Sequence, residues 1–195
     1  MKWKLYKKKG KNKFTFSFGD DRFNYGYEQS SGKGDVDLYY GDLPHKSSEI
    51  IEQNEWLRNV GILWIVIGVF QSGYGSFTRE AFYLDPMWIL IGGACLIWAV
   101  VSKITYTVYN TNEVNLLIIQ DKQHDAVVDT LMSRRKEQLL AWYSDINMEN
   151  ELANEINKFK WLAEQKVLSE EESKQKIEEV KYYHQEQGDT ERVLN

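Results

Sequence analysis

The sequence contains few of the residues on which covalent, metal and cofactor chemistry depends. It has a single cysteine, Cys95, so an intramolecular disulfide is excluded and nothing indicates an oxidising compartment. Its three histidines, His45, His124 and His184, are scattered, with no further ligand type at a spacing that would build a tetrahedral metal site. We therefore expect no metal, no cofactor, no small-molecule substrate and no enzymatic activity.

Phosphate-binding and acid–base motifs are also missing. The segments SGKG at 31–34 and GYG at 73–75 lack the strand-to-helix context of a phosphate loop, and we interpret SGKG as a mobile hairpin tip. The pair His124-Asp125 stands at the start of a predicted helix, where an aspartate interacts favourably with the helix dipole. Because no nucleophile accompanies it, a surface cap is a simpler interpretation than a catalytic pair.

Charge is nearly absent from the middle of the chain, although the mean hydropathy of the whole chain is only -0.53. The first apolar segment, at about 59–77, includes the wholly apolar stretch Val60–Phe70. This stretch is shorter than the roughly 20 residues that a helix needs to cross the hydrocarbon. With Trp56 and Tyr74 as interfacial anchors the length becomes sufficient. The alternative is a buried helix of a soluble protein.

The second apolar segment, at about 86–106, is the stronger candidate for a membrane span. Asp85-Pro86 is typical of a helix start, because aspartate caps a helix and proline fits its first turn. Met87–Val101 carries no charge, and Trp88 and Trp98 lie toward its ends. The two segments together predict a transmembrane hairpin. Small residues would let its helices pack closely, namely Gly61, Gly68, Gly92, Gly93 and Ala94.

Lysine and arginine are almost missing from the connection between the two segments, which has only Arg79. Eleven such residues precede the first segment and twelve follow the second. Because basic residues collect on the cytoplasmic side, we expect a multi-pass protein of the bacterial inner membrane with both termini in the cytoplasm. No apolar core follows the lysine-rich start, so we expect no cleavable signal peptide.

The lysine-rich start has two interpretations. Beside a bilayer, each basic residue near anionic headgroups contributes about 1 kcal/mol, which makes membrane lipid a partner. The residues expected at the membrane surface are Lys2, Trp3, Lys4, Lys7, Lys8 and Lys9. A solvated tail, whose lysines only reflect the excess of basic residues on the cytoplasmic side, is an equally good interpretation. The net charge of -5 counts against nucleic acid as a partner.

Alternating polar and apolar residues predict strands before the membrane segments. Lys13–Phe18 and Arg22–Glu28 form a predicted β-hairpin with an aromatic face. After a flexible SSGKGD loop, Val36–Tyr40 is a third predicted strand, and Ser47–Leu57 is polar and helical in character.

Two strands and a helix are predicted after the membrane segments. The strands are Ile104–Tyr109 and Val114–Ile119, and the helix runs from Asp121 to about Tyr143. The basic run 134–136 in this helix is interpreted as a solvated face. Together with His124 it is also the best cluster for a lipid-acting enzyme, the least favoured function.

The strands on either side of the membrane segments would be marginal alone, so we expect one β-domain in which all of them form a sandwich-like sheet capped by the helix. This arrangement resembles the bacterial PH-like domains, with a membrane hairpin inserted. The predicted fold class is an α+β membrane protein with a two-helix transmembrane hairpin inserted in a PH-like β-domain, followed by a C-terminal helical hairpin. The predicted boundaries are 1–57 and 104–143 for the two β parts, 58–103 for the hairpin, 144–150 for a linker, 151–183 for the helical pair and 184–195 for a flexible tail.

The C-terminal segment FKWLAEQKVLSEEESKQKIEEV is similar to the short C-terminal domain called SHOCT, a helical pair found at the ends of bacterial membrane proteins. Ser169 and Glu172 form a capping box at the start of its second helix. Lys166 stands where the family usually has glycine, and Ser173 where it usually has an aromatic residue. The resemblance implies a role in oligomerisation or partner binding, with the interacting residues Phe159, Leu162, Val167 and Leu168.

These features favour a non-enzymatic inner-membrane protein that mediates self-association or partner binding through its cytoplasmic β-domain and C-terminal helices. We expect a homo-oligomer or a protein partner. The alternative is an immunity or phage-defence protein that protects the membrane against a toxin by contact.

Overall fold

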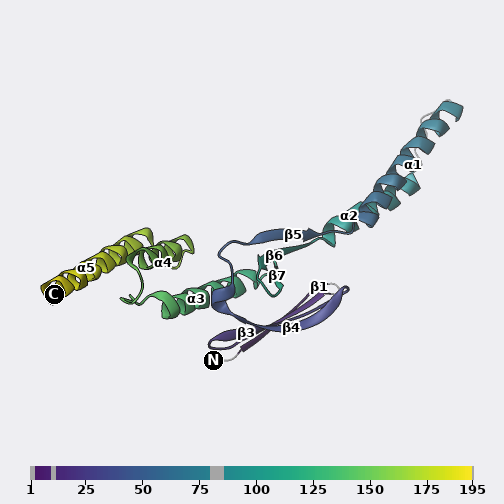
Figure 1. The fold of residues 1–195 in the computed structure, drawn as a ribbon. Helices are drawn as coiled ribbons and strands as arrows, with labels where there is room; N and C mark the ends of the chain where they lie inside the picture. Colours follow the sequence, from purple (N-terminus) through teal and green to yellow (C-terminus); the bar gives the residue numbers. More distant parts are fainter. Residues whose placement is uncertain (1–2, 10–11, 80–85, 195) are drawn as a thin grey trace. The chain divides into compact units, whose positions relative to one another are not determined.

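A computed structural model describes residues 3–9, 12–79 and 86–194 and shows a mixed α+β protein (Figure 1). The chain divides into two compact units: unit 1 comprises Met1–Ser48 and Thr107–Asn195, and unit 2 comprises Glu49–Tyr106. The strands are β1 (Trp3–Lys9), β2 (Asn12–Phe18), β3 (Arg22–Gln29), β4 (Gly32–Tyr39), β5 (Ser48–Glu52), β6 (Ile104–Asn110) and β7 (Asn115–Ile119). The helices are α1 (Glu55–Arg79), α2 (Pro86–Val101), α3 (His124–Tyr143), α4 (Leu152–Glu164) and α5 (Glu170–Leu194), with a short 3-10 helix, η1 (Tyr40–Asp42).

The first sheet has four antiparallel strands in the order β1-β2-β3-β4. Across β2 and β3, Phe16 stands opposite Tyr25 and Phe18 opposite Phe23. These four side chains are buried, as is Phe14, because alternation turns every second residue of each strand toward the interior. The predicted hairpin and its aromatic face are confirmed.

Two predictions for this sheet are wrong. The lysine-rich start is no tail, because Trp3–Lys9 form β1 and pair with β2; Lys2 lies outside the described residues. The flexible loop expected at 30–35 is instead a tight turn at Ser30 and Ser31, and the following residues already belong to β4. In both places hydrogen bonding to a neighbouring strand orders residues whose own strand propensity is low.

The second sheet has three strands in the order β5-β6-β7. Strands β6 and β7 confirm the two predicted after the membrane segments. The helical character expected for Ser47–Leu57 is wrong for its first half, where Ser48–Glu52 form β5, and α1 begins at Glu55. The strands thus form two sheets, where we expected one sandwich-like sheet.

Helix α3 and strand β7 join the segments of unit 1 that precede and follow the insertion. The backbone N–H of Gly41 donates to the carboxamide of Gln138 at 2.8 Å, and the N–H of Leu117 donates to the Tyr25 hydroxyl at 3.0 Å. Val127 and Leu131 on α3 are buried. Residues about ninety positions apart in the sequence therefore share one core.

The C-terminal segment forms two helices, as predicted. The capping box is confirmed, because the N–H of Ser169 donates to Oε2 of Glu172 at 2.7 Å and the N–H of Glu172 donates to the Ser169 hydroxyl at 3.2 Å. The flexible tail expected at 184–195 is wrong for the backbone up to Leu194, because α5 continues to that residue. No proline interrupts this stretch, and the helix continues through Gly188.

Candidate membrane anchor and binding surface

Helices α1 and α2 pack against each other through glycine. A side chain at Gly92 would place its Cβ 2.6 Å from the carbonyl oxygen of Gly61, and one at Gly68 would come 2.7 Å from Ile89. The rings of Trp64 and Trp88 stack with their centroids 4.5 Å apart. Later positions on α1 thus meet earlier positions on α2, so the helices are antiparallel and lie side by side (Figure 1).

Two of the five small residues predicted at this contact do not belong to it. Nothing lies within 4 Å of the Cβ that a side chain at Gly93 would have, and Ala94 is exposed. Gly92, Gly61 and Gly68 form the contact because they share the facing sides of the two helices, whereas the next positions on α2 are turned away by about 100° per residue.

The outer surface of the helix pair is apolar and exposed. Large side chains on it include Phe70, Phe77, Leu90, Ile97 and Val101, and Phe77 is 86% exposed. Among the described residues, Glu55–Thr78 is the one helix both long and apolar enough to cross a membrane, with a mean hydropathy of 1.5. Pro86–Val101 is apolar but shorter. Asp85, the predicted cap of α2, lies outside the described residues.

Hydroxyl groups inside α1 have their hydrogen bonds satisfied within the helix. Ser72 is buried and donates to the carbonyl of Gly68 at 2.7 Å, and Ser76 donates to the carbonyl of Ser72 at 2.8 Å. Such bonds to the preceding turn remove the cost of placing a hydroxyl in an apolar environment.

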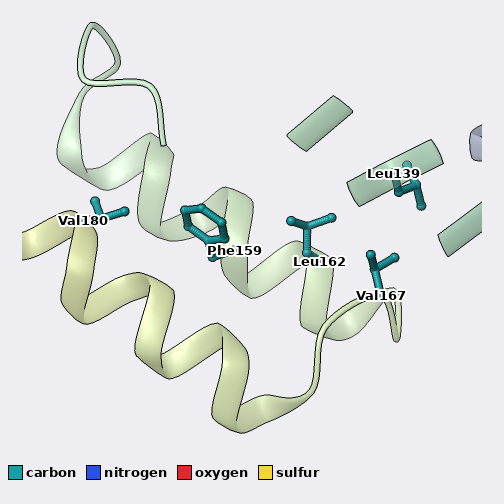
Figure 2. Close-up of a cluster of buried hydrophobic side chains, with 5 residues drawn as sticks. All are labelled: Leu139, Phe159, Leu162, Val167 and Val180. Atoms are coloured by element: carbon teal, nitrogen blue, oxygen red, sulfur yellow. The ribbon is translucent and has the colours of Figure 1, made fainter. Parts of the chain in front are cut away.

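The C-terminal helices form a small core together with α3. Figure 2 shows its five buried side chains, which come from α3, α4, α5 and the connection between α4 and α5: Leu139, Phe159, Leu162, Val167 and Val180. Leu168 is partly buried against them. The prediction that Phe159, Leu162 and Val167 contact a partner is therefore wrong, because their surfaces are already covered within the chain.

Arg135 ties these helices to the rest of unit 1. Its guanidinium donates to the carbonyl of Leu43 at 2.6 Å and to both the carbonyl and the carboxamide oxygen of Gln165, at 3.1 and 2.6 Å. The side chain is buried, and burial lowers the pKa of the guanidinium from its usual value. The solvated face predicted for residues 134–136 is thus wrong for Arg135. Arg134 also bonds within the chain, to the carbonyl of Gly19 at 2.7 Å.

Lys166, in the turn between α4 and α5, and Ser173, in the first turns of α5, have distinctive environments. Lys166 has a φ of 58°, in the left-handed region where glycine is the usual residue. Ser173 is buried, and its hydroxyl donates to the carbonyl of Phe159 at 2.9 Å. A small residue at this position brings α5 close to the backbone of α4.

A fully buried carboxylate stands at the start of α4. Glu155 accepts hydrogen bonds from Lys158 at 2.6 Å, from the carboxamide of Asn150 at 2.7 Å and from the N–H of Asn147 at 3.3 Å. Burial alone raises the pKa of Glu155, but these bonds outweigh it and the pKa lies below its usual value. The bonds fasten the connection from α3 to α4, the predicted linker.

Unit 1 also has a row of four aromatic rings, three of them exposed, that sequence reasoning missed. The aromatic row consists of Tyr39, Trp142, Tyr143 and Trp161, whose successive centroids are 5.6, 6.2 and 5.5 Å apart in edge-to-face geometry. Gly41 lies beneath Trp142, where any side chain would come 2.5 Å from its ring. The four residues come from β4, α3 and α4, so no local pattern connects them.

Both ring nitrogens of His124 lie within hydrogen-bonding distance of a neighbouring side chain. Its Nδ1 lies 2.7 Å from the carboxylate of Asp125, and its Nε2 lies 2.8 Å from the hydroxyl of Thr107, which accepts a bond from Gln120. The histidine thus links the start of α3 to β6, and the expected surface cap is not formed, because the N-cap residue Gln123 makes no side-chain cap hydrogen bond. In the part of the chain that the structure describes, no group of histidine, cysteine and carboxylate side chains is arranged to hold a metal ion.

No family model, curated protein or solved structure matches this chain.

Proposed function

We propose that this chain is a non-enzymatic, membrane-anchored protein whose unit 1 binds a second copy. The observation that carries the anchoring is the apolar, exposed surface of the α1–α2 pair, which would be costly in water and is favourable in hydrocarbon. In this proposal both helices cross the bilayer as a hairpin, and the basic flanks place unit 1 in the cytoplasm.

The aromatic row supports self-association. Aromatic rings prefer to meet edge to face, and an edge-to-face row offers both edges and faces. In a two-fold dimer both copies use the same surface patch, so the row of one copy would meet the row of the other. Anchoring keeps all copies in one plane with the same side toward the membrane, which raises their effective concentration.

The proposal also includes the two family resemblances. A positive φ at Lys166 supports the likeness to SHOCT, because the fold of this turn requires the conformation that a glycine adopts most easily. The joining of residues 1–48 with 107–195 in one unit supports a β-domain that is interrupted by a membrane insertion, as proposed for the PH-like arrangement.

Membrane fractionation and cross-linking test the two halves of the proposal. We expect the chain to remain in the membrane pellet after carbonate washing and to dissolve in mild detergent. Recovery in the supernatant without detergent would contradict the anchoring.

Chemical cross-linking in native membranes should yield a dimer. Trp161→Ala should weaken this dimer, because it removes one end of the aromatic row. The control variant Tyr182→Ala should not weaken it, because Tyr182 is an exposed residue of α5 outside the row. A strictly monomeric chain, or equal cross-linking of both variants, would contradict self-association through the row. A different protein cross-linked through Trp161 would replace the second copy as partner.

A further inference from the structure

The two sheets end in edge strands of opposite charge. In the part of the chain that the structure describes, β1 is an outer strand of the first sheet and β5 an outer strand of the second. The backbone N–H and C=O groups on the outer side of an edge strand form a template for a further strand. Strand β1 has four lysines and no acidic residue, whereas β5 has two glutamates and no basic residue. The two strands therefore have complementary charge.

The order of residues in the two strands is also complementary. Residues 4–7 of β1 are Lys-Leu-Tyr-Lys, and residues 49–52 of β5 are Glu-Ile-Ile-Glu. In each segment two large apolar or aromatic residues stand between two charged residues, and the charges of the two segments are opposite. An antiparallel pairing matches all four positions, with the opposite pairs Lys7–Glu49, Tyr6–Ile50, Leu5–Ile51 and Lys4–Glu52. Opposite-charge pairs and aromatic–β-branched pairs are among the cross-strand pairs that stabilise a sheet.

Strand β5 is open to such a partner. All five of its residues are exposed, and Ile50 and Ile51 are 49% and 53% exposed. The other outer strand of this sheet, β7, is different, because the N–H of Leu117 already donates to the hydroxyl of Tyr25 at 3.0 Å. An exposed edge strand with two isoleucines favours the addition of a strand, in which backbone hydrogen bonds provide affinity and side chains provide specificity.

The glutamates contribute by their charge. Glu52 accepts a hydrogen bond from the Tyr106 hydroxyl at 2.9 Å, and a carboxylate bonded in this way still attracts a lysine. Exposed ion pairs contribute little to affinity, so the charges chiefly select the partner and the register. Because like charges directly opposite each other destabilise a sheet, a lysine-rich strand is a poor partner for its own copy and a good one for an acidic strand.

We propose that β1 of one copy of this chain adds to β5 of a second copy as an antiparallel strand, with Tyr6 opposite Ile50. This contact adds to the self-association proposed above and rests on the proposed membrane anchoring. Strand β5 ends at Glu52 and α1 begins at Glu55, so anchoring holds β5 of every copy at one depth beside the membrane. Confinement to one plane raises the effective concentration of the two strands.

Paired cysteine variants in native membranes test the register, with Cys95→Ser in every copy. One copy carries Tyr6→Cys and a differently tagged copy carries Ile50→Cys; a second combination uses Leu5→Cys and Ile51→Cys. Successive opposite pairs in an antiparallel ladder have Cα atoms about 4.5 and 5.5 Å apart, and both separations allow a disulfide. We expect mild oxidation to give a disulfide-linked product with both tags in at least one combination. Absence of this product in both would overturn the proposal.

Two controls use the same cysteines. Leu5→Cys with Ile50→Cys is one residue out of register and should give about fivefold less product, because a slip of one residue moves each side chain to the other face. Equal or greater yield from this combination would overturn the proposal. A single copy that carries both Tyr6→Cys and Ile50→Cys is also diluted with an excess of cysteine-free copies. The disulfide should then decline, and one that survives dilution lies within a single chain and would overturn the proposal.

Charge exchange tests the choice of partner. In the Ile50→Cys copy, Glu49→Lys with Glu52→Lys should reduce the yield about tenfold, because two attractive cross-strand pairs become repulsive. Adding Lys4→Glu and Lys7→Glu to the Tyr6→Cys copy should restore most of the product, which a misfolded chain would not do. The exposed Glu113→Lys with Glu149→Lys makes the same change of charge outside β5 and should have little effect. An unchanged yield after reversal, or no recovery after exchange, would overturn the proposal.

These outcomes are separable from those of the proposed function. A dimer that depends on Trp161 but gives no mixed disulfide refutes only the pairing of β1 with β5. A chain that is monomeric in its membrane refutes both contacts, and recovery in the supernatant without detergent refutes the anchoring.

Discussion

At Arg135, a charged side chain is buried because three acceptors surround it, two of them on Gln165 in the turn after α4. Arg135→Met retains much of the volume but leaves the carbonyls of Leu43 and Gln165 without this donor. We expect the variant to lose about 1–3 kcal/mol of stability, because buried oxygen acceptors are left without a donor. Thermal unfolding in mild detergent measures the loss. The neighbouring Lys136→Met, at an exposed position, should change little, and equal effects would contradict the buried role.

Lys166 holds a backbone conformation that costs a residue with a Cβ about 1 kcal/mol. Lys166→Gly should therefore raise the stability of the α4–α5 pair by about that amount, seen as a higher melting temperature. Lys166→Ala also removes the charge but keeps the Cβ, so it should be nearly neutral. If alanine stabilised as much as glycine, the lysine charge and not the φ angle would be the cause.

Glu155 makes stability depend on acid pH. Its pKa is depressed in the folded state below the usual 4.5, so its contribution is present above about that pH and is lost as the pH falls through the folded value. Glu155→Gln should be less stable than the unaltered chain near pH 7, and the difference should shrink as the pH falls below about 4. Urea unfolding over a pH series measures both. The exposed Glu149→Gln should leave the stability at pH 7 nearly unchanged.

Among the elements, those with strong local patterns could be predicted and those ordered by a neighbour could not. Alternation predicted β2 and β3, and β-branched and aromatic residues predicted β6 and β7. Periodicity predicted α3 and α4, and the capping box predicted the start of α5. Strand β1 is a run of lysines that pairs with β2 at the edge of the sheet, where lysine is a common residue. Strand β5 is short and has polar residues at both ends, and its extended conformation is stabilised by pairing with β6. Such pairings join distant positions and leave no local signal.

The small residues of the α1–α2 pair also show what the sequence could and could not predict. Composition showed that small residues are present, but only the relative rotation of α1 and α2 decides which of them touch. Gly92→Val would place methyl groups against the backbone of Gly61 and Ile65, where a Cβ alone already lies within 2.6 to 2.9 Å. We expect it to destabilise the pair by about 1–3 kcal/mol. Gly93→Val, in open space on the next position, should leave the melting temperature in detergent nearly unchanged. The reverse order would contradict the packing of the two helices.

Across the whole molecule, unit 1 is interrupted: the chain leaves it near residue 48 and returns near residue 107. Both the aromatic row and the buried core of unit 1 contain residues from before and after this insertion. The sequence showed that strands flank the apolar helices, which was enough to propose a split domain. It did not show that the C-terminal helices dock on α3 through Arg135 and Leu139, because those contacts involve one residue each from distant segments.

Removal of the insertion tests this organisation. The two ends of the insertion are close together, since the Tyr106 hydroxyl reaches Glu52 at 2.9 Å and Asn54 and Ile104 line one cavity. A short glycine–serine linker in place of residues 54–103 should therefore join β5 to β6 without strain. Because the exposed apolar helices are then absent, we expect this variant to be soluble without detergent, and circular dichroism should show strand and helix signals that are lost in one cooperative transition. The full chain, treated in parallel, should still require detergent. A deletion variant that aggregates or lacks a cooperative transition would mean that unit 1 depends on α1 and α2 for its fold, and the interrupted-domain interpretation would then be wrong.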